Sequence, residues 1–243
     1  MVTGRPEYPG SFLDMIVEGL LVLLPPAALL GPWAGSGRVF GYRILVVLLV
    51  GCAVTGWIYP AWVRRFSRAA CAIVVVAVAW AVTGVVGAMR LGPHRDLSSL
   101  MGAGLALAGA WSVARLISDR HIRRERALRD VAIGWAVAVW AGAPLAVWEI
   151  LTARHLGTYA DGAWRNHPGL YRQPATWLTN PNLYAVFLAI GSVWVGVVGV
   201  RSATRWVRIA AIATAVTGLG LLLATDSRIV YAALLLAVMV RLW

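Results

Sequence analysis

Long apolar stretches separated by short polar ones make up most of the chain. Each stretch approaches the ~20 residues that a helix needs to cross the hydrocarbon core of a bilayer. The pattern predicts an all-α, polytopic membrane protein with about eight transmembrane helices, the last of which is incomplete. The predicted spans cover residues 12–31, 42–60, 69–89, 97–117, 131–150, 182–200, 208–225 and 229–243.

Composition and charge narrow this picture. Hydrophobic residues make up 60% of the 243 positions and charged residues 13%, with a mean hydropathy of +0.74, which excludes a water-soluble domain of this length. A net charge of +12 would suit nucleic acid, but the basic residues, all of them arginine, gather between spans. With a cytoplasmic N-terminus most arginines, including those of 115–129 and 201–208, fall on the inner side. We therefore predict a bilayer as partner and no nucleic acid.

The chain is predicted to form a single transmembrane domain over residues 1–243. Residues 1–150 provide five scaffold spans, residues 151–181 form the longest outer loop, and residues 182–243 supply the remaining spans. Long loops are usually functional or disordered, and this one is rich in aromatic residues. Its His155, Asp161 and His167 do not have the spacing of a standard metal site. No metal and no cofactor are predicted.

Two short polar motifs enter the spans from the outer side. In the first, Asn180 can cap a helix whose first residue is Pro181, with Asn182 following. Capping alone explains this NPN tripeptide. It does not explain Arg172 and Arg165 upstream, because the outer side should carry few basic residues.

The second motif is TDSR, residues 225–228. Thr225, Asp226 and Ser227 are all good helix caps, which places Arg228 in the first turn of the last span. The helix dipole disfavours a cation there. An anion bound at the helix start would stabilise the guanidinium, whereas the alternative is an interfacial arginine paired with Asp226.

An arginine upstream of NPN, and SR two spans later, resemble the O-antigen ligase and polymerase superfamily. The family usually has a glycine where Thr176 stands here, and its arginine stands slightly closer to the asparagine. The resemblance implies a multi-pass glycosyltransferase of the bacterial inner (cytoplasmic) membrane, with a cytoplasmic N-terminus and an outward active face. It would move a glycan from a polyprenyl-diphosphate-linked donor to lipid A core or another glycan, in lipopolysaccharide and cell-surface polysaccharide assembly.

The resemblance also assigns roles to residues. Arginine stays protonated, and one guanidinium can bind two phosphate oxygens at once. Arg228 and Arg172 are therefore the predicted catalytic residues, and both would contact the diphosphate. The predicted substrate-binding residues are the two asparagines and the serine of the motifs, together with loop residues suited to holding sugar: Asn180, Asn182, Ser227, Arg165, Trp164, Tyr171 and Trp177.

The transfer reaction needs a base for the acceptor hydroxyl. In the family a histidine lies in a large outer loop beyond the SR-bearing span, whereas this sequence stops at Trp243. We therefore expect a C-terminally truncated member without that loop, in which His167, Asp161 or His155 would have to substitute as base. Whether the chain is an enzyme is left open. The alternatives are a non-enzymatic glycolipid-binding or transport protein, and an inactive remnant.

Overall fold

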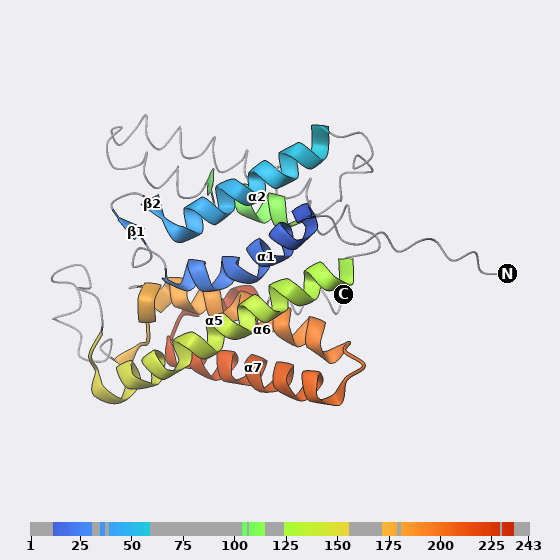
Figure 1. Ribbon diagram of the computed structural model, residues 1–243. Coiled ribbons are helices and arrows are strands. Elements are labelled where there is room, and N and C mark those ends of the chain that lie inside the picture. Colours follow the sequence, from blue (N-terminus) through green and yellow to red (C-terminus); the bar gives the residue numbers. More distant parts are fainter. Residues whose placement is uncertain are drawn as a thin grey trace. The chain divides into compact units, whose positions relative to one another are not determined.

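The protein is helical in a computed structural model that describes residues 12–30, 35–36, 39–58, 104–105, 107–114, 124–155, 172–178, 181–228 and 230–235. In the described ranges, β-structure is limited to a pair of two-residue antiparallel strands, β1 (Gly35–Ser36) and β2 (Val39–Phe40). The helices, shown in Figure 1, are α1 (Phe12–Leu30), α2 (Gly41–Ile58), α5 (Arg124–Thr152), the short 3-10 helix η4 (Thr176–Leu178), α6 (Pro181–Val200) and α7 (Arg205–Ala224).

Three helices in the described part of the chain are long and apolar enough to cross a membrane: Glu125–Thr152, Pro181–Val200 and Arg205–Ala224. Each coincides with a predicted span, and α1 and α2 coincide with two more. Residues 107–114 and 230–235 are helical within two further predicted spans. The predicted span at 69–89 lies outside the described residues, so the structure supports the class of the fold and leaves the total of eight spans a prediction.

The chain divides into two compact units. The first comprises residues 1–21 and 45–127, and the second comprises residues 22–44 and 128–243. In the first unit, a Cβ atom at Gly109 would lie 3.2 Å from a Val46 methyl group, so α2 and the 107–114 helix approach closely there. All residues of the candidate site belong to the second unit.

The core of the second unit lies between α5, α6 and α7. Buried apolar side chains from these helices form one cluster, which Leu29 of α1 and Val230 complete. Polar contacts cross the same interfaces, because Trp140 Nε1 of α5 donates to Thr214 Oγ1 of α7 at 2.9 Å. Hydrogen bonds and close packing hold helices together in lipid, because the hydrophobic effect does not drive helices toward one another there.

Glycines allow the closest helix contacts. A Cβ at Gly199 of α6 would collide with Cβ of Ala211 in α7. Gly134 of α5 lies directly against the carbonyl of Val22. Pro26 lacks the N–H that would normally bond that carbonyl, so α1 accommodates its internal prolines beside a residue without a side chain.

Helices α5 and α7 end in a similar way. Ala153 and Asp226, each following the last turn, have φ values of 54° and 51°. The Ala153 N–H bonds the Glu149 carbonyl at 2.9 Å, and the Asp226 N–H bonds the Leu223 carbonyl at 3.3 Å. These left-handed residues satisfy helix-terminal carbonyls and reverse the chain at the end of the unit where α6 begins.

Candidate functional site

The NPN and SR motifs meet at one end of the second unit. Ser227 Oγ donates a hydrogen bond to Asn182 Oδ1 at 2.9 Å, although the residues are far apart in the sequence. Ser227 is 2% exposed, whereas Asn182 is exposed. Helix α6 begins at Pro181, as predicted. The structure therefore brings two predicted substrate-binding residues into direct contact.

Ser227 starts the last described helical segment. Its carbonyl accepts from the N–H groups of Val230 and Tyr231 at 3.1 and 3.2 Å. Thr225 belongs instead to the end of α7, where its hydroxyl donates to the Leu222 carbonyl at 2.7 Å. Of the three predicted caps, only Ser227 occupies the capping position, and its hydroxyl donates to Asn182.

Arg228 is the first residue after this cap, and its side chain is exposed. Among the residues that the structure describes, no ion pair joins it to Asp226. A cation at a helix start is not unusual here, because α5 begins at Arg124 and α7 at Arg205. What distinguishes Arg228 is its place beside the Ser227–Asn182 contact.

A buried carboxylate lies at the same end. Glu149, in the last turn of α5, is 0% exposed. Its Oε2 accepts from the backbone N–H groups of Ala175 and Thr176, both at 2.8 Å. Burying a charge is costly unless hydrogen bonds and an opposite charge compensate, and this carboxylate gains two charge-assisted bonds from consecutive residues.

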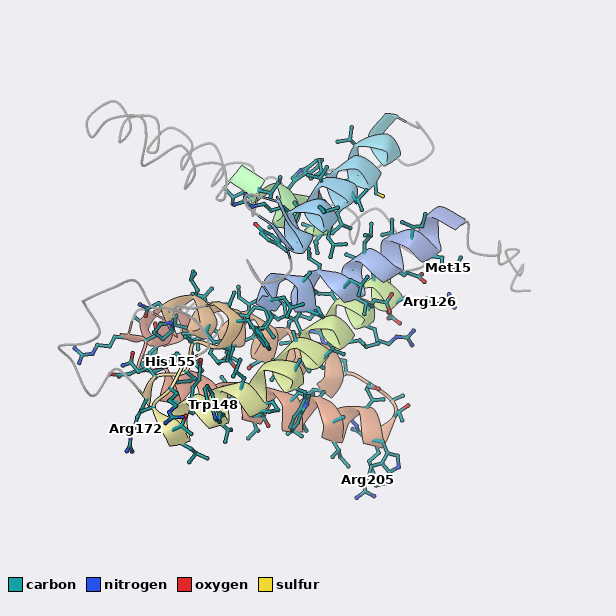
Figure 2. All side chains as sticks on the ribbon, turned by 60° about the vertical axis from the view of Figure 1, so that its left-hand side comes forward. Met15, Arg126, Trp148, His155, Arg172 and Arg205 are labelled. Atoms are coloured by element: carbon teal, nitrogen blue, oxygen red, sulfur yellow. The ribbon has the colours of Figure 1, made fainter. Side chains whose placement is uncertain are left out.

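The second Glu149 oxygen faces a histidine. His155 Nδ1 lies 3.2 Å from Glu149 Oε1, within ion-pair distance. The two atoms do not meet the criteria of a hydrogen bond, so the contact is one of proximity between a carboxylate oxygen and a ring nitrogen. Figure 2 shows His155 and Arg172 at this end of the unit and Arg205 at the other.

The segment that Glu149 binds has an unusual backbone. Thr176 has a φ of 53°, which is rare for a β-branched residue, and it is 1% exposed. Successive N–H groups converge on one anion when such a residue follows an ordinary one. Trp177 and Leu178 then pack on the same cluster as Val230, so this segment and the start of the last helical segment share a core.

Several predicted residues can now be placed. Arg172 is exposed, and Trp177 is half-buried. In the described ranges no three His, Cys, Asp or Glu residues gather as metal ligands would. The remaining predicted site residues lie outside the described residues: Trp164, Arg165, Tyr171, Asn180, Asp161 and His167.

No protein-family model, curated protein or solved structure matches this chain.

Sequence reasoning missed Glu149. A signal was present, since Glu149 is the one acidic residue in the predicted span 131–150. An ionisable residue inside a membrane span is expensive and usually functional. Its partners could not be found in the same way, because backbone N–H groups carry no signature in a sequence.

Proposed function

We propose that this protein is a membrane glycosyltransferase of the O-antigen ligase and polymerase type. It transfers a glycan from a polyprenyl-diphosphate donor to an acceptor hydroxyl, on lipid A core or another glycan. The proposal places it in the bacterial inner membrane with the Ser227–Asn182 end outward. The observation that carries the proposal is the hydrogen bond between these two residues, because it unites the two motifs on which the family resemblance depends.

Two arginines at this end suit a diphosphate. Arg228 and Arg172 are both exposed, so their guanidinium groups are accessible to a lipid head group. A guanidinium can bond two phosphate oxygens at once and remains charged as the leaving group develops negative charge. The N–H groups at the start of the last helical segment favour an anion in the same place. This arrangement stabilises the departing diphosphate without requiring a metal.

His155 is the candidate base for the acceptor hydroxyl. His155 Nδ1 lies 3.2 Å from Glu149 Oε1, and in the tautomer with its proton on Nδ1 the lone pair is on Nε2, the nitrogen that would accept the proton. An imidazole oriented by a carboxylate is the usual arrangement for this chemistry. General-base catalysis contributes about 10²- to 10⁴-fold to a rate, so His155→Gln should lower transfer within that range and leave donor binding largely intact.

The main test compares lysine substitutions of three exposed arginines. The purified protein is reconstituted in liposomes with an undecaprenyl-diphosphate-linked oligosaccharide and lipid A core, and glycan transfer is measured. Arg228→Lys and Arg172→Lys should each reduce transfer by at least about tenfold, because lysine cannot form the bidentate bond. Arg205→Lys, at the first residue of α7 and the opposite end of the unit, is the matched control and should be neutral.

Binding of undecaprenyl diphosphate separates the alternatives. Loss of transfer with binding retained supports an enzyme over a lipid-binding or transport protein. Wild-type protein that binds the lipid but transfers no glycan would support the binding protein instead. If Arg228→Lys and Arg205→Lys behave alike in both assays, Arg228 has no special role and the proposal fails.

A further inference from the structure

Glu149 binds the chain segment that carries Arg172. The contact joins the end of α5 to segment 172–178. It consists of two hydrogen bonds of 2.8 Å, which the backbone N–H groups of Ala175 and Thr176 donate to the Glu149 carboxylate. Ala175 and Thr176 are 0% and 1% exposed, so water does not replace the carboxylate as their acceptor. Removing the acceptor would leave two buried N–H groups unsatisfied, and the segment would have to move to hydrate them.

The backbone of the segment is strained where Glu149 binds it. Thr176 is held in a left-handed conformation that disfavours a β-branched residue, and its own Oγ1 has no hydrogen-bond partner in the part of the chain that the structure describes. A strained residue persists when its surroundings determine its position. Here the surroundings include the Glu149 carboxylate and the packing of Trp177 and Leu178 on the core.

A buried carboxylate is a poor way to gain stability. An apolar side chain of the same size is often equally good or better in a protein interior. What the carboxylate adds is a fixed position, since it accepts from two consecutive N–H groups and no apolar side chain can do so. Its second oxygen lies 3.2 Å from His155 Nδ1.

We propose that Glu149 is a positioning residue that fixes segment 172–178, so that Arg172 is presented to the donor diphosphate together with Arg228. This inference rests on the proposed function. It assigns a role to Glu149, which contacts no substrate itself and acts through segment 172–178. Arg172 stands at the start of the described segment, shortly before the two N–H groups that Glu149 binds, and is exposed. The main chain that carries Arg172 is therefore held by the end of α5.

The experiment uses a matched pair of substitutions in the full chain. Glu149→Gln keeps the length of the side chain and one carbonyl oxygen, which can accept from both N–H groups. Glu149→Met keeps the length and has no such acceptor. Binding of undecaprenyl diphosphate to the detergent-solubilised protein is measured for each, alone and combined with Arg172→Gln or Arg228→Gln.

A specific pattern of effects is expected. Arg172→Gln should weaken binding about 10-fold or more, through loss of charge-assisted bonds. Glu149→Met should weaken it by a similar factor although the protein stays folded, and Glu149→Gln should retain most of the affinity. Combining Glu149→Met with Arg172→Gln should give no further loss, because both remove the same interaction. Combining it with Arg228→Gln should multiply the two effects.

A merely structural role gives a different pattern. In that case Glu149→Met lowers the unfolding temperature, and its effect on binding multiplies with that of either arginine substitution. That outcome overturns the inference, as does wild-type binding by Glu149→Met. If Arg228→Gln weakens binding and Glu149→Met does not, only this inference falls. Wild-type protein that does not bind the lipid overturns the proposed function as well.

Discussion

The contact between α6 and α7 offers a test that is independent of function. Gly199→Ala places a methyl group on Cβ of Ala211, and neither atom can rotate away because both are fixed to helix backbone. Overpacking of this kind costs about 1–3 kcal/mol, while replacing glycine in a helix returns about 0.5–1 kcal/mol. We expect Gly199→Ala to lower the free energy of unfolding by about 1 kcal/mol.

Gly196→Ala is the matched control, one turn earlier on the same helix. Its methyl group would lie 3.6 Å from Cβ of Ala215, an ordinary contact. This variant should keep the gain in helix propensity and be neutral or more stable by up to about 1 kcal/mol. The two variants should therefore differ by about 2 kcal/mol. The assay is equilibrium unfolding in mixed detergent micelles, followed by intrinsic tryptophan fluorescence, to which Trp194 near this crossing contributes.

A second substitution identifies the cause. Ala211→Gly removes the colliding atom, after which the nearest atoms to the new methyl at position 199 are Ala211 Cα at 3.5 Å and the Val207 carbonyl at 4.0 Å. The double variant Gly199→Ala with Ala211→Gly should then recover most of the lost stability. Equal stability of Gly199→Ala and Gly196→Ala, or no recovery in the double variant, would refute the packing of α6 on α7 described above.

Three further predictions use the same unfolding assay. Thr214→Val removes the acceptor of the Trp140 indole N–H and should cost about 0.6–1.7 kcal/mol, as for other interhelical bonds in membranes; no change would mean that the bond is not formed in lipid. Ser227→Ala and Asn182→Ala should show a coupling energy of about 0.5–1.5 kcal/mol in a double-mutant cycle, and simple additivity would contradict their contact. Gly220→Ala, where nothing lies within 4 Å of the added atom, should raise stability by about 0.5–1 kcal/mol, whereas a loss would reveal a contact at this position.

The hydrophobic pattern predicted helices well because length and apolarity are local properties. The starts and ends of α6 and α7 lie close to the predicted bounds of their spans. α5 is different, since it begins at Arg124 and extends well before the predicted start at residue 131. Charged residues can continue a helix beyond a bilayer, and a hydropathy window does not detect this. The pattern therefore located spans but not full helices.

The candidate site was predicted in part. The resemblance selected Asn182 and Ser227, which are in contact, and it selected Arg228 and Arg172, whose roles stay predictions. The dipole argument for Arg228 was less specific than expected, because Arg205 also begins a helix. Arg205 belongs to the inner side in the predicted orientation, where the positive-inside rule accounts for it. Arg228 would lie on the outer side in that orientation, where this rule does not account for it, and a bound anion beside it stays a prediction.

Ser227 illustrates why rules about neighbouring residues do not predict the contacts of the site. Its sequence context predicts a cap that bonds the first turn of its own helix, a contact that contributes about 0.5–2 kcal/mol. In the structure the hydroxyl donates to Asn182, so the buried serine joins two helices. The Ser227 hydroxyl has a single proton, and this proton goes to Asn182. Such a choice depends on the position of α6, which no rule about residues 225–228 contains.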